Sequence, residues 1–259
     1  MPTYQKVIWT AIGVTVLAIL ILGYFLFIVP QAREKSIAKT ELTPRQTPQA
    51  TESSPAQTIE DKDFSPLKID LNQSDPAVRE LIAAAQVPGP LLEWSRQKEL
   101  LRSLVAAVDN VAQGQSPSAQ LAFLAPEQKF AVREINGSLS LDPRSYRRYD
   151  GLVNVFMSIP DETLIFWYKK LLPTLEIAYK ELGYPEISFS QRLRQAIEQL
   201  GQVPLIYGDV LLERKILCYA FADVNLEDLS QAQKHMLRLG PQNVARIQKK
   251  LRALAARLQ

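Results

Sequence analysis

The chain has 259 residues, 47% of them hydrophobic and 22% charged, with a formal net charge of +3. This length suits one globular domain with appendages and excludes two large domains, and the single cysteine excludes a disulfide-rich scaffold and a cysteine-based zinc site. The charge is unevenly distributed, because residues 229–259 contain basic but no acidic residues. A mildly acidic body therefore ends in a basic segment.

An uncharged, strongly apolar run at residues 7–29 follows a short N-terminal tail at residues 1–6. As a helix this run would be about 34 Å long, enough to cross the hydrocarbon core of a bilayer. A buried core helix and a cleaved signal peptide are the alternatives, but the run lacks a polar face, is long for a signal peptide and precedes a poor cleavage site. We expect a transmembrane anchor at 7–29 that binds the lipid bilayer.

The charges beside this run leave its orientation open. Only Lys6 precedes it, whereas Arg33, Lys35, Lys39 and Arg45 follow, so the positive-inside rule places the C-terminal side in the cytoplasm. The very short N-terminal tail and the long segment after the anchor favour the opposite orientation.

Residues 30–74 are rich in Pro, Thr, Ser, Gln and Glu and contain little that could be buried. Such a composition predicts a disordered linker, stiffened by its prolines. Order is expected from Asp75, a good N-cap, followed by Pro76 at the first helical position. We therefore predict one domain over residues 75–259.

Apolar residues recur at helical spacing through most of this domain, so the expected fold class is mainly α. Pro173 lies inside one of the predicted helices, where it predicts a kink. The predicted helices cover 75–86 and 91–114, a segment from 142, then 161–183, 189–200, a segment from 226, and 243–258 after Gly240-Pro241.

Two short stretches depart from the helical pattern. Residues 129–142, KFAVREINGSLSLD, place Asn136-Gly137 between alternating apolar residues, which predicts a small β-hairpin. Residues 216–221, ILCYAF, indicate a short strand or a buried turn. The apolar neighbours of Cys218 predict a buried, unreactive thiol.

Catalytic signals are weak. The one histidine, His235, shares a helix face with Asp228, Gln231 and Arg238, which predicts a solvated residue and not a general base. Neither a glycine-rich phosphate loop nor a serine-nucleophile motif occurs, and we expect no cofactor and no metal. Paired carboxylates remain an enzymatic alternative, with the candidates Asp150, Asp161, Glu162, Asp209 and Glu213.

Two segments could contact a partner. SYRRYD, residues 145–150, could bind an anion, although inward-packed tyrosines and arginines paired with nearby acids would also explain it. The last helix could close the core, dock a partner helix or lie on anionic lipid. The acidic body argues against a nucleic-acid partner. The interaction candidates are Arg147, Arg148, Asp150, Arg238, Asn243, Lys249 and Lys250.

Three stretches of the chain resemble a bacterial family catalogued as domain of unknown function 3014. They are RRYD (147–150), YKKLLPTLEIAYKELGYPEISFSQRLRQAIEQL (168–200) and YAFADVNLEDLSQAQKHMLRLGPQNV (219–244). The resemblance implies an N-terminal anchor, a proline-rich linker and one periplasmic domain, and it favours the periplasmic orientation. It implies no particular activity. Leu239 stands where the family pattern often has Met.

We therefore expect a single-pass inner-membrane protein with a periplasmic helical domain. That domain would be a non-catalytic interaction or structural module of the cell envelope, and its partner would be an envelope protein. The alternative is an envelope enzyme that acts on cell-wall material through carboxylates.

Overall fold

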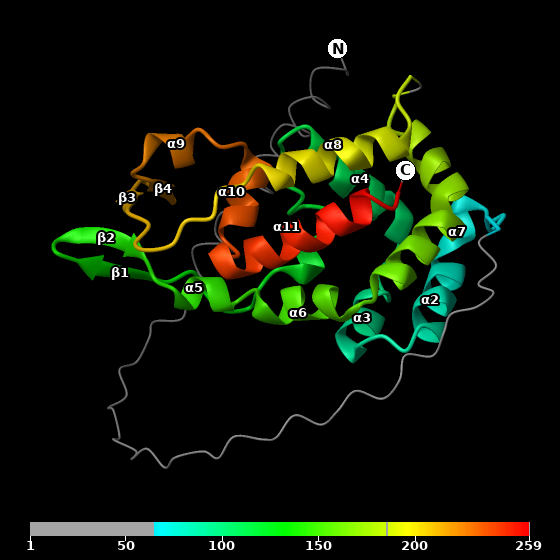
Figure 1. Ribbon diagram of the computed structural model, residues 1–259, viewed down its shortest axis with the longest axis horizontal. Coiled ribbons are helices and arrows are strands. Elements are labelled where there is room, and N and C mark those ends of the chain that lie inside the picture. The colour runs from blue at the N-terminus through cyan, green and yellow to red at the C-terminus, as the bar shows by residue number, and fades with distance from the viewer. Residues whose placement is uncertain (1–64, 185, 259) are drawn as a thin grey trace, which may run out of the picture. The chain divides into compact units, whose positions relative to one another are not determined.

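The computed structural model describes residues 65–184 and 186–258, so the anchor predicted at 7–29 lies outside the described residues. Helices predominate in the described part, and short hairpins lie at one end of it (Figure 1), which confirms the mainly helical class. Within these two ranges, no helix is both long enough and apolar enough to cross a bilayer.

The elements follow one another along the chain with short connections. The helices are α2 (Ser74–Ala84), α3 (Gly89–Trp94), α4 (Leu100–Ala112), α5 (Arg144–Arg147), α6 (Asp150–Ser158), α7 (Asp161–Lys180), α8 (Phe189–Gly201), α9 (Val224–Glu227), α10 (Gln231–Leu237) and α11 (Pro241–Ala255). The strands are β1 (Val132–Ile135), β2 (Ser138–Leu141), β3 (Leu212–Arg214) and β4 (Tyr219–Phe221), and two 3-10 turns are η1 (Leu71–Gln73) and η2 (Ala122–Leu124).

The packed part of the chain begins before residue 75, where the sequence placed the domain boundary. The backbone N–H of Leu67 donates to the carbonyl of Lys170 in α7, at 2.9 Å. Leu71 in η1 is only 6% exposed and belongs to the hydrophobic core. The last residues assigned to the linker therefore pack against the domain.

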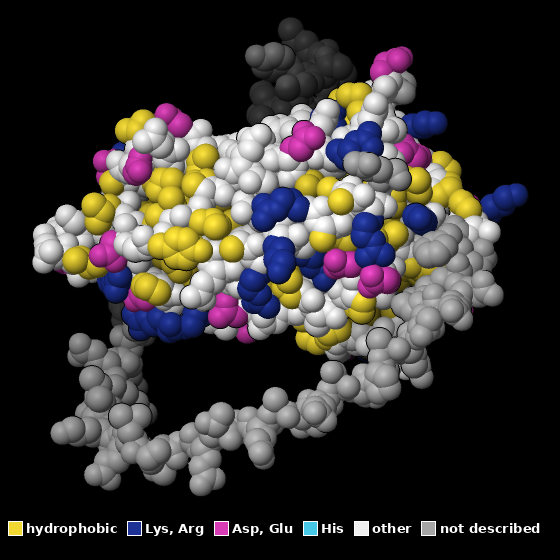
Figure 2. All heavy atoms as spheres, viewed as in Figure 1, with side chains coloured by type: hydrophobic (Ala, Val, Ile, Leu, Met, Phe, Trp, Pro, Cys, Tyr) yellow, Lys and Arg dark blue, Asp and Glu magenta, His cyan; other side chains and the backbone are white. Residues whose placement is uncertain are grey.

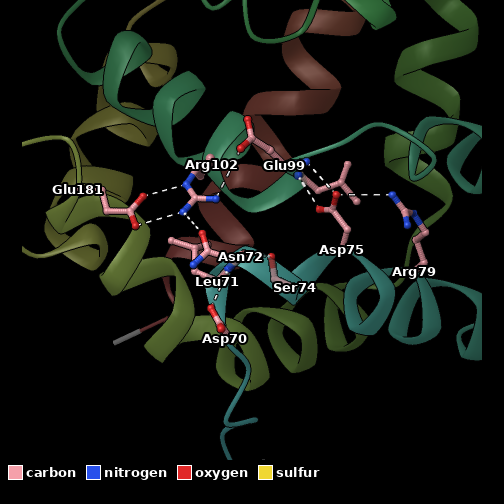
Figure 3. Close-up of polar contacts among 10 residues, drawn as sticks. Asp70, Leu71, Asn72, Ser74, Asp75, Arg79, Glu99, Arg102 and Glu181 are labelled. Carbon is pink, nitrogen blue, oxygen red and sulfur yellow. Dashed lines mark hydrogen bonds and ion pairs between the residues drawn. The ribbon is translucent and has the colours of Figure 1, made fainter.

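Polar contacts fasten this N-terminal segment to α4 and α7 (Figure 3). Arg102 of α4 binds both carboxylate oxygens of Glu181, at 2.8 and 3.1 Å, and donates to the side chain of Asn72 at 2.9 Å. Asp75 accepts hydrogen bonds from the backbone N–H groups of Glu99 and Leu100, at 2.8 and 2.9 Å. Asp75 thus caps α4, whereas the sequence predicted it as the cap of its own helix, α2, which has no side-chain cap.

The hairpin predicted at Asn136-Gly137 is present. Its strands β1 and β2 pair antiparallel, and Asn136 and Gly137 have φ values of 51° and 77°, as a two-residue type I′ turn requires. A second hairpin, β3 with β4, was not predicted as a pair. A bridge between Ser140 and Leu211 joins the two hairpins.

Two helices differ from the sequence prediction in detail. The single helix expected from Asp142 is divided into α5 and α6 around Arg148 and Tyr149. Asp142 accepts a hydrogen bond from the N–H of Arg144 at 2.8 Å, so the predicted acid does lie at a helix start. Helix α7 continues through Pro173 without interruption.

Two hydrophobic cores share one helix. The first lies among α2, α4, α7 and α8 and contains the fully buried Val105 and Tyr179. The second lies among the hairpins, α10 and α11 and contains the fully buried Val244. Helix α8 provides Phe189 to the first core and packs Leu200 against the second. It therefore couples the two cores.

Candidate functional site

A pocket of about 570 Å³ lies between the second hairpin, α9, α10 and the α5–α6 junction. Its wall combines aromatic rings with basic side chains, and Glu227 is the acidic residue among its lining. We call it the basic pocket. The aromatic residues are Phe130, Tyr149, Tyr219 and Phe221, and the basic residues are Arg148, Lys234 and Arg238.

Arg148 is held in place by backbone and aromatic contacts. Its guanidinium donates to the carbonyls of Ser145 and Gln128, at 2.9 and 3.1 Å. It also lies over the rings of Phe130 and Tyr149, 5.5 and 5.3 Å from their centres. No carboxylate of residues 65–184 or 186–258 forms an ion pair with it. The guanidinium is therefore oriented without having its charge neutralised.

Lys234, in contrast, has its charge balanced. Its side chain is 11% exposed and donates to the carboxylate of Glu227 at 2.9 Å and to the carbonyl of the same residue at 2.8 Å. Glu227 also accepts a hydrogen bond from the N–H of Phe221 at 2.9 Å. The hydrogen bond from Lys234, followed by that from Phe221, lowers the pKa of Glu227 below its ordinary value. This pair joins α9, α10 and β4 and supports the pocket.

Arg238 is the second uncompensated cation of the pocket. It is exposed at the C-cap of α10, where the negative end of the helix favours a positive side chain. It forms no ion pair with any carboxylate of the described residues. Since Lys234 is neutralised by Glu227, the two arginines leave the basic pocket with a positive charge. An anion between them would gain charge-assisted hydrogen bonds.

A second depression, of about 440 Å³, adjoins the basic pocket and shares Arg148 with it. Its lining includes Lys129, Arg144 and Arg147, but no acidic residue. Arg144 is paired with Asp142 at 2.7 Å, whereas Arg147 is exposed and has no ion-pair partner among the described residues. The positive surface therefore extends from α10 to α5.

The tip of the second hairpin borders the basic pocket and is apolar. Ile216 and Leu217 are 99% and 96% exposed, and Leu217 and Cys218 line the pocket. Cys218 is exposed, so the prediction of a buried thiol was wrong. The apolar run ILC forms the turn between β3 and β4 and not a core segment. Figure 2 shows hydrophobic side chains gathered over this end of the molecule.

His235 lies on α10 but does not line the basic pocket. Its Nδ1 is 3.4 Å from the hydroxyl of Ser116. Burial, and then the charge of Arg238, lower the pKa of His235 below its ordinary value. The imidazole is thus partly buried, more than the solvated position that the sequence predicted.

The remaining interaction candidates lie outside the basic pocket. The amide of Asn243 in α11 donates to the carboxylate of Asp150 at 2.7 Å and to the carbonyl of Leu239 at 3.1 Å. Lys250 is 6% exposed and donates to the carbonyls of Met157 and Ile159. Lys249 is exposed on α11. Asp150, Asn243 and Lys250 therefore join helices, whereas Arg148 and Arg238 face the pocket.

The carboxylates considered for catalysis are not gathered in the basic pocket. Glu213 pairs with Lys215 at 2.7 Å, and Asp209 pairs with Arg133 at 2.6 Å. Asp150 is bound to Asn243. Among residues 65–184 and 186–258, no group of three or more His, Cys, Asp or Glu side chains is placed to hold a metal ion.

Sequence reasoning identified Arg148 and Arg238 as interaction candidates, and Tyr149 as part of SYRRYD, but missed the other members of the basic pocket. Gln231, Lys234 and Arg238 lie three and four residues apart, and this spacing on one helix face was the available signal. Phe130 and Tyr219 could not be found in this way, since only the tertiary fold brings the two hairpins beside α10.

The basic pocket lies entirely within a matched family region. The model of a family described as "Protein of unknown function (DUF3014)" matches residues 100–255. No curated protein matches the chain, and no solved structure matches it.

Proposed function

The chain belongs to the family described as "Protein of unknown function (DUF3014)", and from this starting point we propose that it is a non-catalytic interaction module of the cell envelope. In this proposal residues 7–29 anchor the chain in the inner membrane as a single span, and the helical domain lies in the periplasm. The basic pocket binds an acidic, partly apolar segment of another envelope protein.

The observation that carries this proposal is the pair of uncompensated arginines in a pocket with aromatic walls. Arg148 is already oriented by the Ser145 and Gln128 carbonyls, so binding a carboxylate costs little side-chain entropy. Arg238 offers a second guanidinium from α10. Arginine and tyrosine are the residue types that dominate the energy of protein interfaces.

The apolar tip beside the basic pocket supports a protein segment as the ligand. Ile216 and Leu217 are almost fully exposed, which is costly unless a partner covers them. A small inorganic anion would bind the arginines without covering the tip. An acidic segment with apolar side chains would occupy both surfaces.

The exposed Cys218 on the pocket rim allows a direct test, because it is the only cysteine of the chain. A thiol-linked photoreactive group is attached to Cys218 in the full chain in its native membranes, and the captured protein is identified by mass spectrometry. We expect Arg238→Glu to lower the yield of that product at least tenfold, because a charge reversal repels an acidic partner. The yield of the crosslinked product is also expected to decrease as the salt concentration is raised.

A matched control separates recognition from a general effect of charge. Arg194 is exposed on α8, away from the basic pocket, and Arg194→Glu makes the same charge change. This variant should give the same yield of crosslinked product as the unsubstituted chain. If Arg238→Glu and Arg194→Glu give equal yields, or if the captured segment is basic, the proposal is wrong.

The periplasmic orientation has its own test with the same thiol. A membrane-impermeant maleimide is added to cells whose outer membrane alone has been permeabilised. Labelling of Cys218 at this stage is the expected result, since the thiol is exposed in the folded domain. Labelling that begins only after the inner membrane is broken would place the domain in the cytoplasm.

A further inference from the structure

An apolar cavity of about 370 Å³ lies far from the basic pocket, within the first core. Helices α2, α3, α4, α7 and α8 and the turn η2 contribute its wall. The lining consists of aliphatic and aromatic side chains with a few hydroxyl and amide groups, and it contains no charged side chain. Two tryptophans, Trp94 and Trp167, are part of it.

The cavity extends from the surface into the core. Leu104, on its wall, is 45% exposed, whereas Leu101 and Phe189 on the same wall are each 2% exposed. Protein interiors contain few voids larger than a water molecule, and empty apolar space destabilises a fold in proportion to its volume. A cavity of this size and chemistry therefore favours an apolar occupant.

The shape and chemistry suit a single hydrocarbon chain. A cavity of about 150 Å³ holds one benzene molecule, so this volume is room for roughly a dozen methylene groups. A hydrocarbon chain needs no hydrogen-bond partner, which agrees with the lining. The backbone of a docked peptide helix could not enter the buried part of the cavity beside Phe189, which a hydrocarbon chain can occupy.

Basic residues lie on the loop that borders this cavity. Ser95 and Gln97 line the cavity, and Arg79 of α2 fixes both residues by donating to their carbonyls at 2.8 and 2.9 Å. The same loop carries Arg96 and Lys98, both exposed, but Arg96 pairs with Glu93 at 3.0 Å. Lys98 forms no ion pair with any carboxylate of the described residues, so a chain whose polar end is anionic would meet its positive charge at the rim.

We propose that this cavity binds an acyl chain of an anionic membrane lipid. The source of the chain rests on the proposed anchor: 35 residues separate residue 29 from Ser65, and a chain of that length reaches at most about 120 Å. A lipid of the same membrane would then be within reach of the domain. Binding itself does not depend on the basic pocket.

Quenching of tryptophan fluorescence tests this proposal. The full chain carries Trp9→Phe, so that Trp94 and Trp167 are the only tryptophans, and is reconstituted into lipid nanodiscs of phosphatidylglycerol with brominated acyl chains. The expected result is at least a twofold loss of emission relative to unbrominated lipid. Ser103→Phe, which places a ring in the cavity wall, should restore most of it.

Leucines of matched exposure provide the control. Leu104 lines the cavity and is 45% exposed, and Leu211 lies elsewhere and is 46% exposed. Leu104→Arg should reduce quenching severalfold, and Leu211→Arg should not. Absence of quenching by the brominated lipid would overturn the proposal. Equal quenching in Leu104→Arg and Leu211→Arg would also overturn it, because it would indicate contact with the bilayer surface alone. Arg238→Glu should leave quenching unchanged, so the test of the apolar cavity can succeed or fail independently of the test of the basic pocket.

Discussion

Asp75 lies in the first turn of α2, yet its carboxylate binds the backbone N–H groups of Glu99 and Leu100, which begin α4. The residue before α4, Glu99, has φ of 54°, a conformation that is uncommon outside glycine. Its own side chain makes no capping hydrogen bond. The start of α4 therefore depends on an acid from another helix, which satisfies two N–H groups and places negative charge at the positive helix end.

We predict that Asp75→Ala lowers the free energy of unfolding by about 1–2 kcal/mol, since a lost helix cap costs this much. Asp75→Asn should cost less, because one oxygen can still accept a hydrogen bond. Urea unfolding followed by circular dichroism measures both. Glu93→Ala is the control, since Glu93 forms a largely exposed ion pair with Arg96 and its loss should leave the midpoint unchanged.

At the scale of elements, RRYD contacts the residues GPQN (240–243) of the third family stretch. Gly240, the N-cap of α11, has φ of 82°, and a Cβ at this position would lie 2.6 Å from Cγ of Tyr146. Asn243 of the same helix binds Asp150. These contacts join α11 to α5 and α6, so Asp150, Gly240 and Asn243 stabilise the fold. Arg148 and Tyr149 of RRYD line the basic pocket.

Gly240→Ala should therefore lower the free energy of unfolding by about 3 kcal/mol, from a strained φ together with a steric overlap with Tyr146. Gly151→Ala is the matched control. Gly151 lies inside α6 with open space where a Cβ would be, so the substitution should stabilise the domain by up to about 1 kcal/mol. Similar losses in the two variants would contradict the proposed packing against Tyr146.

Sequence patterns predicted an element correctly where the residues of that element determine its conformation by themselves. Asn136-Gly137 requires positive φ at both positions, and the hairpin follows from this alone. The stretch Ile216–Cys218 misled the prediction, since an apolar run normally indicates burial, whereas here it forms an exposed turn. The prediction that Asp75 caps its own helix was wrong, because its carboxylate binds the start of α4, a tertiary contact that no local pattern contains.

The candidate site was predictable only in part for the same reason. Arg148 and Arg238 stood out as polar residues in notable motifs. Their meeting in one pocket depends on the position of α10 beside the second hairpin. The apolar cavity left no signal at all, because its lining residues have the same helical spacing as a filled core.

At the scale of the whole described domain, α8 links two cores that could otherwise behave as separate units. Arg192 of α8 and Asp109 of α4 strengthen one side of this link with an ion pair at 3.0 Å, in which both side chains are largely buried. On the other side, the amide of Gln248 in α11 donates to the carbonyls of Leu200 and Val203. This arrangement favours one cooperative unfolding transition.

Val244→Ala tests the coupling, because Val244 is fully buried in the second core, whereas Trp94 and Trp167 line the cavity in the first. We expect a loss of about 2 kcal/mol from the cavity that the substitution leaves. In the Trp9→Phe background, tryptophan fluorescence and circular dichroism should report the same lowered midpoint. Val224→Ala, at a position 69% exposed, should leave both unfolding midpoints unchanged. An unchanged fluorescence midpoint in Val244→Ala would mean that the cores unfold independently.

The cap that Asp75 provides also sets the smallest piece of this polypeptide that can fold by itself. The family match starts at residue 100, whose own backbone N–H is bound by Asp75. A fragment cut at that boundary would expose the start of α4 and remove Leu71 and Val78 from the first core. Recombinant production of the helical domain should accordingly start no later than Ser65, ahead of the Leu67 contact with α7.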